Sequence, residues 1–211
     1  MAFKYCINSE YIFYREGSKN FQAALLGFRR IEYYEDYGEE IKAKITLPQT
    51  EESVVSAIQA IINWACCAEA CLNKLYFDWG MDNAKYTKFT HKNVRLRIDE
   101  LNDMFDHFIS PKLKIRLLEL AHARNMYVHF DEIPIVCGAT VLTPEFKALS
   151  INKMLVYRTA IRCLGKAISD LPYKFNILNA GYPIIGDGEI MLESENPEVN
   201  FKPSVARFLL N

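Results

Sequence analysis

Apolar residues recur at helical spacing along most of this chain, and that periodicity constrains its fold more than any other feature. Residues 50–79 show it most clearly, and Thr50 with two acidic residues after it suits a helix N-terminus. The apolar residues that fall within about 40° of Val54 around this helix are Ile58, Ile61, Ala65 and Leu72. The segment therefore predicts a long helix with one face in a hydrophobic core.

Further helical segments follow the same pattern. Residues 18–44 predict one helix, and residues 93–108 predict another. Pro111 opens a third at 111–130, and Thr143-Pro144-Glu145 begins a fourth that we expect to end near Asp170. Long helices joined by modest loops favour an all-α fold, an antiparallel bundle of four to five long helices.

The two ends of the chain have a different character. Short β-prone runs occur at 4–14 and at 182–192, the second with a Gly-Asp-Gly turn. We expect a single domain over residues 1–211, with its helical core at about 18–170. The segments 1–17 and 171–211 are then short β-like or irregular ends.

Overall charge and hydropathy limit where the protein acts and what it binds. The net charge is −1 in 211 residues of which half are apolar, so an anionic ligand must be held by local charge. The sequence contains no run of 18 apolar residues and no signal-peptide core, so we expect a cytoplasmic protein without a membrane span.

The six cysteines are scattered without a disulfide framework, which indicates reduced thiols. Cys66, Cys67 and Cys71 lie close together, but adjacent helical positions point about 100° apart and no histidine pair lies near them in sequence. Small core thiols are the better interpretation, and we expect neither a metal nor a cofactor.

One arginine falls on an apolar helix face. With Leu113 set to zero, helical winding places Arg124 at about 20°, in the middle of the expected core stripe. That stripe comprises Leu113, Leu117, Leu120, Ala121, Tyr127 and Val128. A buried guanidinium needs a carboxylate, and Glu69 occupies a similar place on helix 50–79, with Asn73 beside it. Their pairing can be purely structural, or it can border a polar site.

His129 falls on another face of the same helix, about 140° from Arg124. It shares that face with His122, Asn125 and Leu118. Such a mixed face suits a groove or a subunit interface, although most helical histidines are surface residues.

The segment Arg124-Asn125-Met126-Tyr127-Val128-His129 resembles the R-x(4–6)-H motif of the HEPN superfamily, including a polar residue after the arginine. The upstream EACLN, from Glu69 to Asn73, is similar to the acidic-then-asparagine helix of many HEPN proteins. The resemblance covers about 18–170. One HEPN subgroup, paired in toxin–antitoxin systems, carries H-x-Y, and Asp131 departs from that pattern.

The resemblance implies a metal-independent endoribonuclease that dimerises so that two motifs line one cleft. Arg124, His129 and Asn125 would then be catalytic, with Glu69, Asn73 and His122 in support. RNA is the implied substrate, in a defence, toxin-like or RNA-processing role, and an inhibitory protein is an implied partner. The alternatives are a catalytically inactive HEPN-like module that binds RNA, a nucleotide or a protein, and a helical interaction protein.

A basic stripe lies on the last expected helix. Arg158, Arg162 and Lys166 follow a spacing of four residues. They can track an RNA backbone, or they form an ordinary solvated helix face. The sequence contains no Walker loop, dinucleotide-binding turn, zinc-protease motif or hydrolase elbow.

Overall fold

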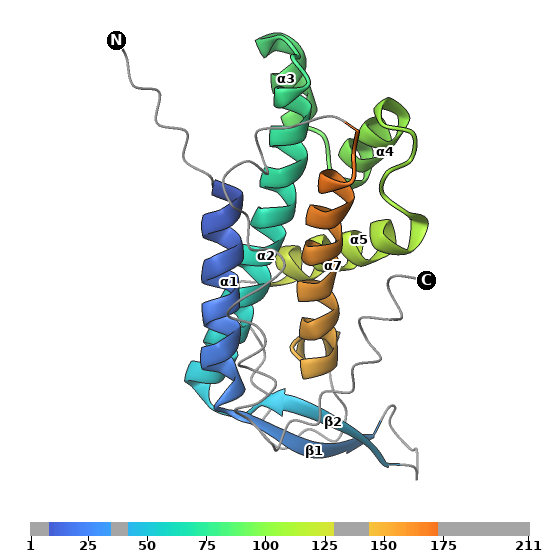
Figure 1. The fold of residues 1–211 in the computed structure, drawn as a ribbon. Coiled ribbons are helices and arrows are strands. Elements are labelled where there is room, and N and C mark those ends of the chain that lie inside the picture. Colours follow the sequence, from blue (N-terminus) through green and yellow to red (C-terminus); the bar gives the residue numbers. More distant parts are fainter. Residues whose placement is uncertain (1–8, 35–41, 129–143, 173–211) are drawn as a thin grey trace, which may run out of the picture.

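The fold was obtained as a computed structural model, which describes residues 9–34, 42–128 and 144–172. The described part is mostly helical and contains one small two-stranded sheet (Figure 1). The expectation of a predominantly helical protein is confirmed. The structure differs from the expected β-like N-terminus, all-helical middle and single last helix.

The first helix, α1 (Ser9–Leu25), begins at Ser9 rather than at Ser18. Residues 9–14 are therefore helical and not β-like, because Tyr14 and Phe21 share one buried face with the intervening Gly17. Aromatic residues favour strands in general, but here tertiary packing against a neighbouring helix overrides that local preference.

The predicted helix at 18–44 is wrong beyond Leu25. A β-hairpin replaces it, formed by β1 (Phe28–Tyr34) and β2 (Lys42–Pro48), with Ile31 opposite Ile45 in an antiparallel register. Alternation explains the hairpin, since Ile45 and Leu47 lie two residues apart and strand side chains repeat with a period of two.

Gly27 ends the helix and starts the hairpin. A Cβ at this position would lie 2.4 Å from the Cβ of Ser53, so only glycine allows the turn to approach the next helix this closely. The Gln49 N–H donates a hydrogen bond of 2.9 Å to the Gly27 carbonyl, which joins the two ends of the hairpin.

The central helix is α2 (Glu51–Asp78), and its predicted start is confirmed. Thr50 is the N-cap and forms a capping box with Ser53. The Trp64 side chain is completely buried, and a Cβ at Gly17 of α1 would meet its ring at 2.5 Å. The backbones of α1 and α2 consequently lie close together.

Five helices follow α2 in the described residues. α3 (Asn83–Thr90) is a short helix that the sequence analysis did not predict. α4 (Val94–Met104) begins after the N-cap Asn93, and α5 (Pro111–Val128) begins at the proline as predicted. The last predicted helix is split into α6 (Pro144–Ala148) and α7 (Ile151–Ser169), because Ser150 caps a new helix N-terminus.

The helices form an irregular bundle rather than a simple antiparallel one. Figure 1 shows that α1 runs antiparallel to α2, that α7 runs in the same direction as α2, and that α5 crosses them. The hairpin lies at the end of the bundle where α1 ends and α2 begins. One buried cluster joins all these elements; its largest fully buried side chains include Trp64, Phe21, Phe89, Ile61, Leu72, Ile98, Leu117 and Leu120.

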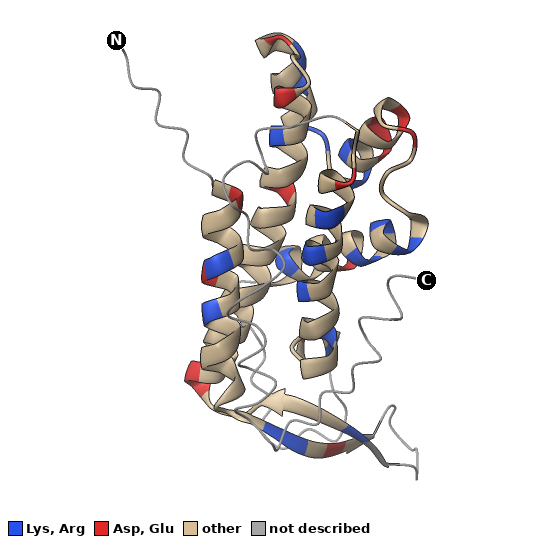
Figure 2. Ribbon diagram, viewed as in Figure 1, with Lys and Arg blue, Asp and Glu red and all other residues tan. Residues whose placement is uncertain are grey.

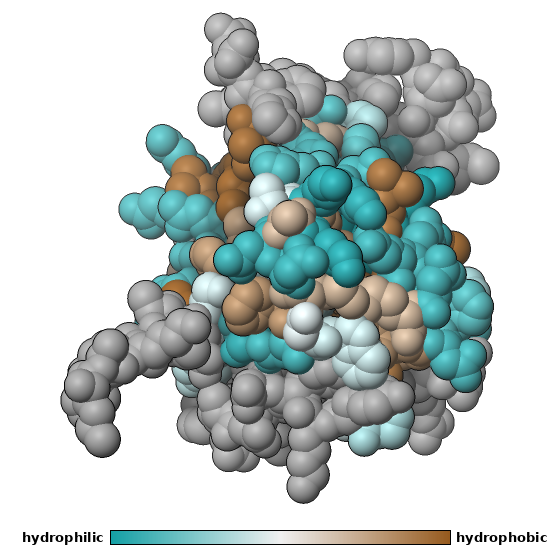
Figure 3. Space-filling model, turned by 90° about the horizontal axis from the view of Figure 1, so that it is seen from above, coloured by the Kyte–Doolittle hydropathy of each residue, from teal (hydrophilic) through white to brown (hydrophobic). Residues whose placement is uncertain are grey.

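The surface of the described part carries separate apolar areas. Figure 3 shows them divided by hydrophilic residues on the end of the molecule seen from above. The predicted β-prone segment at 182–192 lies outside the described residues, as do residues 1–8 of the N-terminal segment.

Candidate functional site

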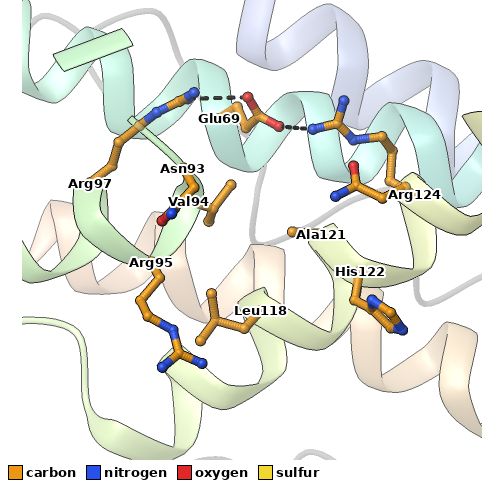
Figure 4. Close-up of a pocket in the computed structure, with 10 residues that line it drawn as sticks. Glu69, Asn93, Val94, Arg95, Arg97, Leu118, Ala121, His122 and Arg124 are labelled. Carbon is orange, nitrogen blue, oxygen red and sulfur yellow. Dashed lines mark hydrogen bonds and ion pairs between the residues drawn. The ribbon is translucent and has the colours of Figure 1, made fainter. Parts of the chain in front are cut away.

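Three helices bring charged side chains together around one carboxylate. Glu69 of α2 lies between Arg97 of α4 and Arg124 of α5 (Figure 4). Its Oε1 accepts a hydrogen bond from Arg124 Nη2, and its Oε2 accepts one of 3.1 Å from Arg97 Nη1. The structure therefore contains the Glu69–Arg124 contact that helical winding suggested.

Arg124 lies at the rim of the core rather than in its middle. Its side chain is 26 % exposed, and Val128, expected in the core, is 48 % exposed. The buried residues of α5 are Leu113, Leu117, Leu120, Ala123 and Tyr127. The buried face is thus rotated towards Ala123 from the predicted stripe, which leaves Ala121 only partly buried and puts Arg124 at the boundary with solvent.

Arg97 is the residue of this cluster that the sequence analysis missed. Its side chain is 8 % exposed, and it donates to the carbonyls of Lys92 at 2.7 Å and Thr90 at 2.9 Å. A helical pattern could have found it, because Val94, Arg97 and Leu101 share one face of α4 at spacings of three and four. A buried arginine with these acceptors holds the α3–α4 connection against α2.

Asn73, predicted as a supporting residue, contacts Arg97. Its Oδ1 accepts a hydrogen bond of 3.2 Å from Arg97 Nη1, so it helps to fix Arg97. It lies one helical turn after Glu69 on α2. Glu69 and Asn73 together form the α2 side of an arginine-binding surface.

The charged cluster opens onto a pocket of about 350 Å³ between α4 and α5. Its lining residues are Glu69, Asn93, Val94, Arg95, Arg97, Leu118, Ala121, His122, Arg124 and Asn125. The lining contains three arginines against a single carboxylate, so with neutral histidine the pocket is cationic although the whole chain has a net charge of −1. Such a pocket suits an anion.

The mixed face of α5 forms one wall of this pocket. Leu118, His122 and Asn125 all line it, so of the groove and the subunit interface suggested for this face, the structure contains the hollow. The subunit interface stays a prediction. His122 and Asn125 are exposed. His129 itself lies outside the described residues, so its position relative to Arg124 stays a prediction.

The basic residues of α7 do not line the pocket. Figure 2 shows basic residues spaced along the ribbon of α7, and the Arg158 guanidinium lies 5.9 Å from the centre of the Phe21 ring. Arg158 and Arg162 are partly buried, whereas Lys166 is exposed. The predicted stripe exists, but it is separate from the Glu69 cluster.

The cysteines of α2 have the character of core thiols. Cys67 and Cys71 are buried, and Cys66 is partly buried. Burial raises the pKa of the Cys66 thiol, and the nearby Glu69 carboxylate raises it further, which disfavours a reactive thiolate. Within residues 9–34, 42–128 and 144–172, no group of three or more His, Cys, Asp and Glu side chains is arranged to hold a metal ion.

The apolar character of α2 has a structural explanation. By length and composition alone, this helix could cross a membrane. In the fold it packs against α1, α5 and α7, and Ile61, Trp64 and Leu72 are buried in the common core. These apolar residues therefore belong to the core of the described bundle.

The chain was compared with known proteins at the level of families, sequences and folds. No protein-family model, curated protein or solved structure matches it.

Proposed function

We propose that this protein is a metal-independent endoribonuclease of the HEPN type, acting as a cytoplasmic homodimer in a defence or toxin-like role. The observation that supports the proposal best is the cationic pocket, in which Arg124 of the R-x4-H segment lies at the rim. A pocket with three arginines, one carboxylate, one histidine and two asparagines matches the needs of phosphodiester recognition.

The chemistry requires no group beyond these side chains and the substrate. RNA carries its own nucleophile, the 2′-hydroxyl, which attacks the adjacent phosphorus and expels the 5′-oxygen of the next nucleotide. A histidine with a pKa near neutrality can remove the proton from the 2′-hydroxyl or return one to the leaving oxygen. Arg124 would hold the phosphate by two parallel hydrogen bonds and stabilise its developing charge.

The other pocket residues have supporting roles in this proposal. Glu69 engages one nitrogen of Arg124 and so orients the guanidinium towards the pocket. Asn125 follows Arg124 on α5 and offers an amide donor to the phosphate, while His122 lines the same wall. His129 is the proposed general acid or base on the basis of the motif.

We propose dimerisation from the helix that the sequence predicts for residues 111–130. In a regular helix over that range, residues 124 and 129 would be about 140° apart and would not face one small target squarely. Two copies related by a two-fold axis can bring the arginine face of one helix to the histidine face of the other. Light scattering tests this part, since full cleavage by a strict monomer would contradict it. An inhibitory protein would be a natural further partner in a toxin-like role.

In the decisive experiment, the purified full chain is incubated with mixed-sequence RNA in excess chelator, and the cleavage products are analysed. The wild type should produce 2′,3′-cyclic phosphate ends and leave DNA of the same sequence intact. His129→Ala should lower the cleavage rate by about 100-fold or more. His91→Ala is the matched control, because His91 is exposed at the end of α3 and does not line the pocket.

The outcomes separate the catalytic assignments. Equal cleavage by the wild type, His129→Ala and His122→Ala would contradict the enzyme hypothesis. Absence of cleavage by the wild type would contradict it as well. Loss of cleavage in His122→Ala alone would move the acid–base role to the histidine that lines the pocket.

One observation favours a second candidate, a catalytically inactive HEPN-like module that binds RNA, a nucleotide or a protein. Glu69 engages both Arg97 and Arg124, and Asn73 is committed to Arg97, so much of the motif forms a fixed network between helices. RNA binding that is lost in Arg124→Ala, without cleavage by the wild type, would select this candidate.

A further inference from the structure

We propose that Arg95 binds the phosphate group next to the one held by Arg124, so that the pocket takes two consecutive phosphates of one RNA strand. The inference rests on the proposed function, because it adds a second phosphate subsite to the same pocket. Nothing in the motif resemblance points to Arg95, which lies outside the R-x4-H segment and on a different helix.

The three arginines of the pocket differ in how far their donors are already used. Arg97 donates to four acceptors and is nearly buried. Arg124 shares Glu69 with it and is about one quarter exposed. Arg95 is exposed, and among the described residues it has no hydrogen-bond or ion-pair partner. Its guanidinium is therefore the one most available to an incoming anion.

The position of Arg95 suits a second phosphate rather than the same one. Figure 4 shows Arg95 and Arg124 on opposite sides of the pocket, with Val94 and Ala121 between them and Leu118 beside Arg95. A single phosphate bound at Arg124 leaves Arg95 without an anion. A strand that crosses the apolar strip would place its next phosphate towards Arg95.

The apolar strip also indicates how the nucleoside between the phosphates is held. Val94, Ala121 and Leu118 offer apolar contact but no hydrogen-bonding side chain, and none of the described lining residues is Phe, Tyr or Trp. Base recognition by aromatic stacking is therefore absent from this wall. We infer recognition through the backbone phosphates, with little preference for base identity.

Binding of uncleavable dinucleotides tests the subsite directly. The probes are 2′-O-methyl UpU, which has one phosphate, and the same dinucleotide with an added 5′-phosphate (pUpU) or 3′-phosphate (UpUp). At low salt, one of the phosphorylated probes should bind the wild-type chain about fivefold more tightly than UpU. Arg95→Ala should remove this gain while changing the affinity for UpU by less than about twofold.

Two further variants and the salt dependence complete the test. Arg95→Lys should keep part of the gain, and Arg15→Ala should keep all of it, because Arg15 is 53 % exposed on α1 and does not line the pocket. The salt dependence of Kd for the tighter probe should become weaker in Arg95→Ala, because one contact between a guanidinium and a phosphate is lost.

The inference is overturned if neither phosphorylated probe gains over UpU, if the gain survives in Arg95→Ala, if Arg15→Ala loses it equally, or if no probe binds. Because the probes cannot be cleaved, this result is independent of catalysis. A protein that cleaves RNA without the Arg95-dependent gain keeps the enzyme proposal and loses the subsite. A protein that shows the Arg95-dependent gain but does not cleave RNA keeps the subsite and loses the enzyme proposal.

Discussion

Two carboxylates of the bundle are each paired with cationic side chains of neighbouring helices, and they differ in what surrounds them. Glu10 of α1 is 1 % exposed and accepts a hydrogen bond of 2.6 Å from Lys74 of α2. Glu69 of α2 is 22 % exposed, contacts two arginines and faces a pocket of about 350 Å³. The first pair is enclosed between helices, whereas the second is open to a ligand.

The comparison shows that an ion pair alone does not indicate function. Both carboxylates satisfy the rule that a buried charge needs a partner. Of these two carboxylates, it is Glu69 that contacts two arginines and lies in the lining of a cationic pocket. Excess charge at an accessible surface distinguishes a candidate site from a structural contact.

The largest expected effect separates the two arginines that share Glu69. Arg97→Ala should lower the free energy of unfolding by about 3–5 kcal/mol, because it removes a nearly buried charge from its partners and leaves the partly buried carbonyls of Thr90 and Lys92 without their donors. Arg124→Ala should cost about 1 kcal/mol, since its side chain is partly exposed. Urea denaturation measures both.

A third arginine provides the control for this comparison. Arg116 of α5 pairs with Glu119 and is 28 % exposed, so Arg116→Ala should cost less than about 1 kcal/mol. If Arg97→Ala costs no more than Arg116→Ala, Arg97 does not anchor the cluster.

The enclosed pair should show a smaller effect. Lys74→Met removes a donor from the buried Glu10 carboxylate and should lower the free energy of unfolding by about 2 kcal/mol at pH 7. Lys19→Met is the control, because the Lys19–Glu16 pair is largely exposed. RNA binding should be unchanged in both variants, and a loss of binding in Lys74→Met at full stability would contradict the division into an enclosed and an open carboxylate.

The smallest effect concerns the pH dependence of stability near the enclosed pair. Burial raises the pKa of the Asp78 carboxyl above its usual 3.8, with Lys74 lowering it and Glu10 raising it. The folded state then holds its proton more tightly than the unfolded chain. The stabilising contribution is therefore full below pH 3.8 and is lost as the pH rises through the raised pKa.

Asp78→Asn should consequently stabilise the protein by no more than about 0.5 kcal/mol at pH 7, with the gain shrinking towards acid pH. Thermal melts from pH 3 to pH 7 follow this difference, and Asp103→Asn, an exposed change on α4, is the control. A gain that grows as the pH falls would show that the sign is wrong.

The sequence predicted the helices whose ends carry strong local signals. Thr50, Asn93 and Pro111 mark the starts of three helices at or beside the predicted residues. The hairpin was missed because its apolar residues also fit a helical period when read across Gly27. The separation of α6 from α7 was missed because Ser150 lies between two segments that continue one another in apolar spacing.

The candidate site was predictable in the part that depends on charge within an apolar stripe. Arg124 and Glu69 each interrupt such a stripe, and the structure brings them together. The role proposed for Arg95 has no comparable sequence signal, since only the structure shows that this exposed arginine lines the pocket. Arg97 had a signal, but α4 is short and strongly charged, which obscured it.

The hydrogen bond between Gln49 and Gly27 has a consequence for the evolution and engineering of this fold. This bond holds residues 27 and 49 together, so the chain leaves the bundle and returns to it at the same point. A short connection between α1 and α2 could therefore replace the hairpin without changing the path of either helix. The replacement would still lower the free energy of unfolding, because Phe28 and Leu47 of the hairpin are buried in the hydrophobic core. A chain shortened in this way would thus keep its helix arrangement, but it would need new apolar side chains to cover the end of the bundle that the hairpin now covers.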